Sequence, residues 1–324
     1  MKKILITGAN GYIGSRLSKL FYENGYSVFG ICYPSLPQNS EWEKYFDKII
    51  LGDLRDISLI KKITQTNYDI AINLVSLDHH QSNGEPTFVN SINVTPTLSL
   101  LKAFSEKNTL KKFIYFSTIH VYGQLSSELI SEKKVAKPQN IYGLTHFLSE
   151  QIVNYYNSNS EISCINIRLS NSFGSPILED NNCWGLVVND LCKSAFIDNK
   201  IILQSDGSPQ RDFVHGNDIY NALESIINYE HDHHHDNIYH VSSGETYTIL
   251  ELAHIVKEIY FDRYKIEVPI YLPGNVKSES YKILKSVNKY TISNTKIISI
   301  GFKSEFNIRQ GIEEVFDYLE KKHV

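Results

Sequence analysis

Short apolar runs alternate with amphipathic segments through the first half of the chain. The first run, Lys3–Thr7, precedes a stretch from Tyr12 to Asn24 whose apolar residues recur at helical spacing. Further strand-like runs follow at Ser27–Cys32, Lys48–Leu51, Ile70–Val75, Lys112–Ser117 and Ser163–Leu169, and helical segments stand out at Phe88–Phe104 and Tyr142–Tyr156. This alternation predicts an α/β fold built on a doubly wound parallel sheet with right-handed crossovers.

Three glycines lie where the first predicted strand turns into the first helix. They belong to the run Thr7-Gly8-Ala9-Asn10-Gly11-Tyr12-Ile13-Gly14. In this context Gly8 allows the tight turn, Gly11 lets the backbone approach a pyrophosphate, and Gly14 lets the helix pack close to the sheet. An ordinary glycine turn is the alternative. The position directly after an apolar strand favours a Rossmann loop that holds a nicotinamide dinucleotide at the helix N-terminus.

The second strand leaves the choice between NAD and NADP open. An acidic residue about 20 residues beyond the glycines usually accepts the ribose hydroxyl of NAD, and an Arg there accommodates the phosphate of NADP. The run Gly30-Ile31-Cys32-Tyr33-Pro34-Ser35 has neither. Because no carboxylate repels a 2′-phosphate, the sequence leans slightly to NADP. Asp53 and Leu54, after the third strand, are expected near the adenine in either case.

The second half of the chain has a different texture. After Asn171, Gly, Pro, Ser and Asp cluster at Phe173–Asn182 and Ser205–Arg211, which indicates longer loops. We expect a dinucleotide-binding domain over residues 1–170, with segments near 212–246 returning to it. The remainder of residues 171–324 is expected to form mainly a smaller lobe that binds the substrate.

Composition and charge exclude several classes of protein. The chain has 324 residues, is 42% hydrophobic, and balances 32 basic against 36 acidic residues for a net charge of −4. Such a balance argues against nucleic acid or an anionic membrane as the principal partner. No apolar stretch approaches the roughly 20 residues of a membrane span. The four Cys lack CxxC spacing and no signal peptide is evident, so we expect a cytoplasmic protein.

A histidine-rich segment invites a metal interpretation. It runs from His231 to Asp236 (HDHHHD) between a helix and a strand. A solvated loop is the alternative, and it is favoured because no spacing rule fixes a tetrahedral site there. We therefore predict no metal site.

Later motifs resemble those of the extended short-chain dehydrogenase/reductase family, the nucleotide-sugar epimerases, dehydratases and reductases of polysaccharide biosynthesis. The motifs occur in the family's order over most of the chain: Asn73-Leu74-Val75-Ser76, Asn93, Ser117-Thr118-Ile119-His120-Val121-Tyr122-Gly123, Tyr142-Gly143-Leu144-Thr145-His146, Arg168 to Gly174, Arg211-Asp212-Phe213-Val214, Asn217-Asp218 and Ser242 to Glu245. Each motif is weak alone, and their common order makes the resemblance specific.

The resemblance assigns the chemistry to a tyrosine and a hydroxyl. Tyr142 would be the general acid/base on a sugar hydroxyl or carbonyl, and Thr118 would hold that oxygen. Both residues have structural alternatives, since Tyr142 could pack as a helix-start aromatic and Thr118 could be a plain strand-end hydroxyl. A phenol with a pKa near 10 transfers protons usefully only if its anion is stabilised. The family Lys that supplies this stabilisation is replaced by His146, which is largely neutral at pH 7.

A second departure narrows the reaction. Family dehydratases carry an Asp-Glu pair directly after the Ser/Thr, where this chain has Ile119 and His120. We therefore expect epimerisation or ketone reduction, most simply at C4, and no elimination. His120 would be either a general acid beside the sugar or a packed histidine. A dinucleotide- and sugar-nucleotide-binding protein without turnover is the alternative from another class, motivated by His146.

The resemblance also implies residues for the cofactor and the substrate. Asn171 would donate to the diphosphate of a nucleotide sugar, and Arg211 would contact the diphosphate or ribose, although a plain surface loop is the alternative for Arg211. A further Arg expected near the carboxyl end is missing, since Lys277–Ser293 contains only Lys cations, so the nucleotide stays unassigned. We expect a homodimer, because the helical segments Phe88–Phe104 and Tyr142–Tyr156 carry more apolar residues than one sheet face can cover. The residues implied for the cofactor are Gly8, Asn10, Gly11, Tyr12, Ile13, Gly14, Asp53, Leu54, Leu74, Val75, Asn93, Tyr142 and His146, and those for the substrate are Thr118, His120, Tyr142, Asn171 and Arg211.

Overall fold

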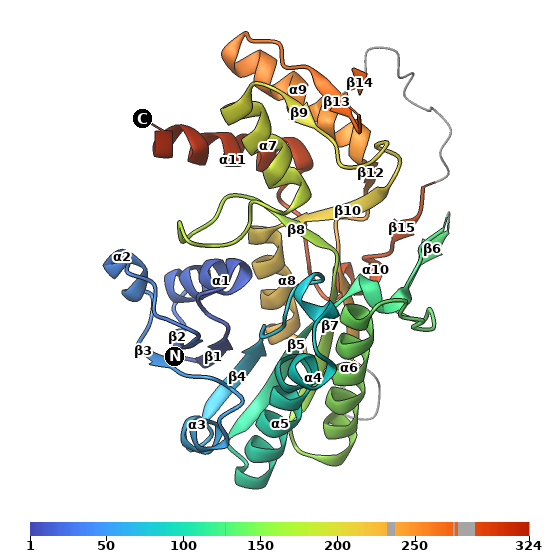
Figure 1. The fold of residues 1–324 in the computed structure, drawn as a ribbon. Helices are drawn as coiled ribbons and strands as arrows, with labels where there is room; N and C mark the ends of the chain where they lie inside the picture. The colour runs from blue at the N-terminus through green and yellow to red at the C-terminus, as the bar shows by residue number, and fades with distance from the viewer. Residues whose placement is uncertain (127, 232–236, 275, 278–288, 324) are drawn as a thin grey trace.

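Seven parallel strands form the central sheet of the protein (Figure 1). A computed structural model describes residues 1–126, 128–231, 237–274, 276–277 and 289–323. The sheet has the order β11-β7-β5-β4-β1-β2-β3, in which the chain starts at the centre and winds outward in both directions. Its strands are β1 (Lys3–Thr7), β2 (Ser27–Cys32), β3 (Lys48–Leu51), β4 (Tyr68–Asn73), β5 (Leu110–Thr118), β7 (Ser163–Leu169) and β11 (Ile238–Val241). The predicted doubly wound α/β fold is confirmed.

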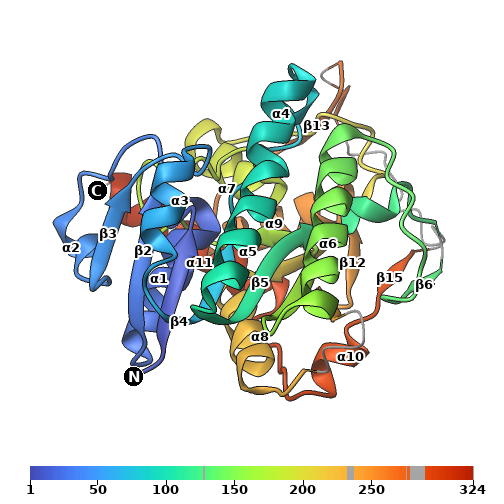
Figure 2. The same ribbon diagram turned by 90° about the horizontal axis from the view of Figure 1, so that it is seen from below.

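Helices cover both faces of this sheet because alternate strand residues point to opposite sides. Ile4 and Ile6 of β1 pack in one cluster with α1 (Tyr12–Glu23) and α8 (Gly216–Asn228), and Leu5 packs in another with the opposite layer. That opposite layer holds α3 (Ile57–Ile63), α5 (Thr95–Lys107) and α6 (Ile141–Asn159) side by side (Figure 2). The short α2 (Ser40–Glu43) lies between β2 and β3 in the chain.

Two predicted elements differ from the structure in informative ways. The helix expected over Phe88–Phe104 is two helices, α4 (Pro86–Asn93) and α5. Pro96 interrupts the expected helix because proline has no N–H to donate to the backbone carbonyl of Ile92. The proline ring would also clash with that carbonyl. The strand expected over Ile70–Val75 is β4 and ends at Asn73. The apolar pattern extends further because Leu74 and Val75 line a cavity beyond the end of the strand.

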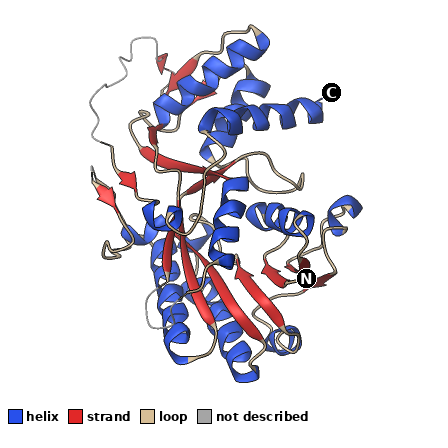
Figure 3. Cartoon of the chain, turned by 180° about the vertical axis from the view of Figure 1, so that it is seen from behind, coloured by secondary structure: helices blue, strands red, loops and turns tan. Residues whose placement is uncertain are grey.

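The segments after residue 170 divide between the sheet and a second lobe (Figure 3). α8 and β11 return to the main sheet, whereas α7 (Val187–Asp198), α9 (Ile249–Tyr264) and α11 (Ile308–His323) pack around a separate apolar cluster. Small sheets accompany these helices. They comprise β8 (Asn171–Phe173), β10 (Gln210–His215) and β12 (Thr246–Thr248), then β9 (Ile201–Ile202), β13 (Ile270–Leu272) and β14 (Val276–Lys277). A separate pair formed by β6 (Leu129–Ile130) and β15 (Thr291–Ile292) packs with Ile119, Val121 and Tyr122. The remaining short helices are η1 (Gln81–Asn83), η2 (Ile119–Tyr122) and α10 (Thr295–Ile298).

A polar cluster ties α11 of the second lobe to α1 of the sheet layer. Arg16 Nη2 donates to Glu314 Oε1 at 2.7 Å, and His215 Nε2 lies 2.6 Å from Glu314 Oε2. Burial alone would raise the pKa of Glu314, but the hydrogen bond from His215 and the charge of Arg16 hold that pKa well below its usual range. The carboxylate therefore contributes to stability only while it is ionised.

We predict that Glu314→Gln lowers the free energy of unfolding by about 2 kcal/mol at pH 7, the usual size of hydrogen bonds to a charged group. Because the folded-state pKa is depressed, this contribution is complete above the unfolded pKa near 4.5 and is lost as the pH falls toward the folded value. Urea denaturation from pH 3 to pH 7 measures it. Glu313→Gln, at an exposed position on the same helix, is the matched control. Equal unfolding energies for the two variants would refute the assignment.

Candidate functional site

The loop between β1 and α1 has the shape that its glycines require. Gly8 has a positive φ of 69°, and Gly11 N donates to Gly8 O at 2.9 Å. A Cβ on Gly14 would lie only 2.1 Å from that same carbonyl oxygen, and one on Gly11 would lie 3.1 Å from it. The backbone is therefore bare where α1 begins, and its first N–H groups are available to an anion.

A cavity of about 590 Å³ adjoins this loop. Seven of the residues implied for the cofactor line it: Gly8, Asn10, Gly11, Asp53, Leu54, Leu74 and Val75. The lining continues over Cys32 at the end of β2, Ser76 and Leu77 after β4, and Phe88 on α4. The carboxyl ends of β1, β2, β3 and β4 thus border one cavity, as expected for this fold.

The other residues implied for the cofactor do not belong to the lining of this cavity as far as the chain is described. Tyr12 Oη donates to Gly174 O at 2.9 Å, and Ile13 packs against the core beneath the sheet. Asn93 is buried, its Oδ1 accepts from Leu77 N at 2.8 Å, and its Nδ2 donates to Thr145 Oγ1. In this structure Asn93 therefore fixes the loop that follows β4.

Arg55 is a lining residue that the sequence reasoning missed. It forms an ion pair with Asp53, which, with a backbone N–H, lowers the pKa of that carboxyl against the effect of burial. Its guanidinium carbon lies 6.0 Å from the ring centre of Tyr33 and 5.5 Å from that of Phe88. The sequence could have indicated Arg55, since it directly follows the Gly52-Asp53-Leu54 run.

Tyr142 lies in the first turn of α6, opposite the end of β5. Asn140 caps this helix by accepting a hydrogen bond from Gly143 N at 2.7 Å, which sets where the first turn begins. Burial raises the pKa of Tyr142 to about 12, a hydrogen bond with Thr118 opposes the rise, and the negative charge of Asp78 adds to it. The structure therefore brings Tyr142 and Thr118 together.

His146 is buried one turn further along α6, with both ring nitrogens paired. Its Nδ1 lies 2.9 Å from Tyr115 Oη and its Nε2 lies 3.1 Å from Ser76 Oγ. Burial lowers the pKa of His146 to about 3, so the ring is neutral at pH 7. The ring centres of His146 and Tyr142 are 4.6 Å apart, yet His146 brings no positive charge to the phenol.

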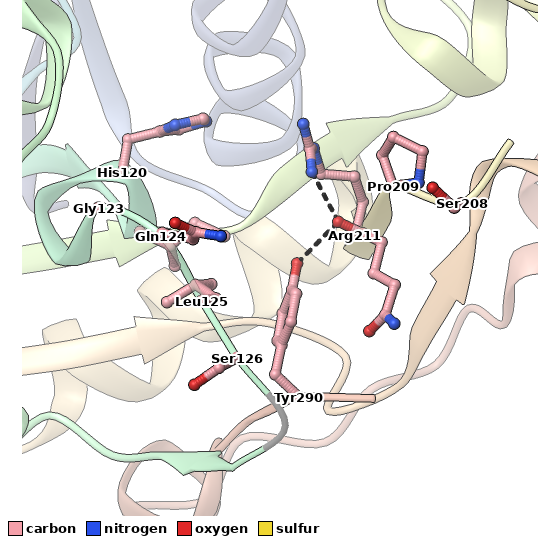
Figure 4. Close-up of a pocket in the computed structure, with 11 residues that line it drawn as sticks. His120, Gly123, Gln124, Leu125, Ser126, Ser208, Pro209, Arg211 and Tyr290 are labelled. Atoms are coloured by element: carbon pink, nitrogen blue, oxygen red, sulfur yellow. Dashed lines mark hydrogen bonds between the residues drawn. The ribbon is translucent and has the colours of Figure 1, made fainter. Parts of the chain in front are cut away.

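A second cavity, of about 360 Å³, opens on the other side of His120 (Figure 4). Arg211 lines it from β10 and points across it toward the His120 ring. Tyr290 and Gln124 also line it in the close-up, and Tyr290 Oη donates to Gln210 O at 3.1 Å. Neither Tyr290 nor Gln124 was singled out from the sequence, because only the fold brings them to this place.

Asn171, the first residue of β8, is hydrogen-bonded within the protein. Its Nδ2 donates to the backbone carbonyl of Asp212 at 2.9 Å, which joins β8 to β10. It does not line the cavity that holds Arg211 and His120. In this structure its amide supports the strand that carries Arg211.

No helix in the described part of the chain has the length and apolar content needed to cross a bilayer. No group of three or more potential metal ligands gathers among the described residues. Residues 232–236 of the histidine-rich segment lie outside them, so the expectation of no metal site there stays a prediction. Residues 278–288 also lie outside the described residues. They make up most of the stretch Lys277–Ser293, where a further Arg was expected and the sequence has only Lys cations.

Comparison with known proteins places these features in a family. Residues 4–247 match the model of the NAD dependent epimerase/dehydratase family. A putative UDP-glucose 4-epimerase of Methanocaldococcus jannaschii is 25% identical over 323 residues and is covered to 99%, as is this chain. The human dTDP-D-glucose 4,6-dehydratase is 22% identical, with 99% of this chain and 91% of that protein aligned. The structure of UDP-glucuronic acid 4-epimerase from Bacillus cereus, in complex with UDP-glucuronic acid and NAD, superposes with a TM-score of 0.77 at 22% identity and 99% coverage of both chains. The glycine cradle and the sheet order agree with the family match, and the chain belongs to the NAD dependent epimerase/dehydratase family.

Proposed function

We propose that this protein is an NAD(P)-dependent oxidoreductase or epimerase that acts at C4 of a nucleotide-diphosphate sugar. The observation that carries the proposal is the position of the Tyr142–Thr118 pair between the two cavities. Tyr142 is linked to the first cavity through His146 and Ser76, and its ring centre lies 5.7 Å from that of His120, which lines the second. A candidate proton-transfer group thus lies between the cavity beside the glycine loop and the cavity lined by Arg211.

The residues around the first cavity fit a nicotinamide dinucleotide. The N–H groups at the start of α1 suit its pyrophosphate. The glycines let the turn close tightly beneath these groups, since a Cβ on Gly14 would collide with the carbonyl oxygen of Gly8. Asp53 and Leu54 would hold the adenine side. The bound cofactor would take up a hydride from the sugar carbon and return it. The protein's own residues would carry out the rest of the reaction.

The choice between NAD and NADP rests on the sequence argument about the end of the second strand. The family description names NAD and the Bacillus cereus structure contains NAD, and an NADP preference is the finer proposal for this chain. Two observations support an NADP preference. Cys32, at the ribose-side end of β2, is buried and uncharged, and Arg55 is the only Arg or Lys that lines the cavity among the described residues. Asp53 already pairs with that Arg, so a 2′-phosphate would compete with a carboxylate for the guanidinium.

The protein groups divide the work at the sugar. Tyr142 would donate or accept the proton of the C4 hydroxyl, and Thr118, which is 5% exposed, would hold the same oxygen. Arg211 would grip the diphosphate in the second cavity. Ile119 has no ionisable group and His120 has no carboxylate, so the two groups that an elimination requires are absent from their family positions. We therefore propose epimerisation or ketone reduction, without 4,6-dehydration.

The proposal is tested by incubating the purified protein with NAD, NADP and a panel of UDP-, dTDP-, GDP- and CDP-sugars. An epimerase forms the C4 epimer without net cofactor consumption, whereas a ketoreductase oxidises NADH or NADPH stoichiometrically with a 4-keto sugar. Tyr142→Phe, which removes the proton and keeps the ring, should abolish turnover and preserve binding. Binding of both ligands without conversion of any sugar would favour the binding protein. A 4-keto-6-deoxy product would overturn the exclusion of dehydration.

A second prediction concerns the missing cation. Because His146 is neutral and burial raises the pKa of Tyr142 to about 12, activity that requires the phenolate should rise toward alkaline pH. His146→Lys places an ammonium near the phenol and should move this limb down by about one or more pH units. His146→Gln, which adds no charge, is the control. An unchanged limb in the Lys variant, measured from pH 6 to pH 10, would refute the electrostatic account.

We also propose that two copies pair through α5 and α6. Ile141, Leu144, Leu148 and Tyr155 recur at helical spacing on α6 and are 44%, 40%, 42% and 61% exposed. Leu98 on the adjacent α5 is 44% exposed. An apolar stripe of this length on neighbouring helices suits a symmetric interface. Light scattering should give a dimer mass at micromolar concentration, and Leu148→Glu should give a monomer, while the exposed Ile57→Glu on α3 should not.

A further inference from the structure

The proposed function leaves two histidines beside Tyr142 without a role. His120 stands in η2 and His79 in the exposed loop after β4. The ring centre of His120 lies 5.7 Å from that of Tyr142 and 6.0 Å from that of His79, and the His79 and Tyr142 rings are 6.1 Å apart. Three proton-carrying rings thus form one cluster that extends from the buried phenol to the surface.

The His120 ring is placed differently from a packed histidine. Both nitrogens of His146 have protein partners, as described above. Within the described residues, the hydrogen bonds found at His120 are those of its backbone: its N–H donates to Thr118 Oγ1 at 3.2 Å, and its carbonyl accepts from Gly123 N at 3.1 Å. Its side chain instead borders the second cavity, where it faces Arg211 (Figure 4). The ring nitrogens are therefore available to water or substrate.

The chemistry of Tyr142 gives such a ring a task. When the sugar carbon is oxidised, its hydroxyl proton must leave as the hydride departs. A tyrosine that is already protonated can take this proton on Oη only if it passes its own proton to another acceptor. A neutral imidazole is an acceptor at pH 7, and one water or substrate hydroxyl can bridge the distance between the rings.

Arg211 is one of the groups that lower the basicity of His120. Burial first, then the positive charge of Arg211 and the neighbouring His79, lower the pKa of His120 to about 4. The other groups near the ring are Tyr142 and the buried His146, both uncharged at pH 7, and the Asp78 carboxylate, which acts on Tyr142. A diphosphate bound to Arg211 would cancel its charge and raise the basicity of His120.

We propose that His120 accepts the proton of Tyr142 during sugar oxidation, that a substrate diphosphate on Arg211 prepares His120 for this step, and that His79 passes the proton to solvent. This inference rests on the proposed function. In the reverse direction the proton returns from His120 through Tyr142 Oη to the sugar oxygen as the hydride returns to carbon, so that protons and electrons balance. The diphosphate grip and the proton transfer would then be coupled through one cavity.

The coupling is tested without turnover by following the imidazole C–H resonances by NMR as the pH is varied. His120→Asn identifies the resonance. In the ligand-free protein, Arg211→Gln should raise the pKa of His120 by about half a unit or more, with Arg211→Lys as the charge-conserving control. Saturating UDP, the probe used, should raise it in the wild type and leave it unchanged in Arg211→Gln. Identical titration of His120 in the wild type and Arg211→Gln would overturn the proposal.

The proton transfer is tested on whichever sugar nucleotide the wild type converts. His120→Asn should lower kcat at least tenfold with little change in KM, and free imidazole should restore part of the rate, whereas Tyr142→Phe should gain nothing from imidazole. His80→Asn is the matched control, since His80 contacts the ring of His79 and not that of His120. Wild-type kcat in His120→Asn would overturn the inference and leave the proposed function intact. Absence of turnover in the wild type would instead overturn the proposed function.

Discussion

A buried ion pair beneath the site holds its parts in register. Glu150 of α6 accepts two hydrogen bonds from Arg168 of β7, at 2.9 and 2.7 Å, and both residues are almost fully buried. Glu150 also accepts from Ser117 Oγ of β5 at 2.6 Å. Removing one partner of such a pair leaves an uncompensated charge and typically costs about 3–5 kcal/mol. The helix that carries Tyr142 is thereby fixed against the strand that ends at Thr118.

The same pair extends into a network that reaches the segment around β15. Arg168 Nη1 donates to Tyr122 Oη at 2.7 Å, and that oxygen lies 2.6 Å from His240 Nε2. The other nitrogen of His240 lies 2.9 Å from Ser293 O, next to β15. The turn that carries His120 is thus supported from below by hydrogen-bonded side chains, so the His120 ring can be open to the cavity while its backbone stays fixed. Such support is what a proton-transfer geometry needs.

Local patterns predicted the sheet because each strand and the glycine turn can be identified from a few consecutive residues. β1, β2, β3 and β7 lie where the apolar runs indicate, and the Gly8 cradle follows from spacing alone. The environment of His146 could not be predicted in this way. Its partners Tyr115 and Ser76 belong to different segments, and nothing local to α6 indicates that they meet there. Asn93 shows the same limit, since its contacts with Leu77 and Thr145 depend on which segments the fold brings together.

The neutral ring of His146 changes where positive charge lies around Tyr142 and His120. A cation at that position would sit on the cofactor side of Tyr142 and favour the phenolate before any sugar arrives. Here that side is neutral, and the positive charge that acts on the ring cluster is Arg211, on the substrate side. Before a ligand binds, Arg211 opposes protonation of His120. In the proposal above, a bound diphosphate would cancel this effect, so that the substrate, and not a cation beside the cofactor, would control proton transfer.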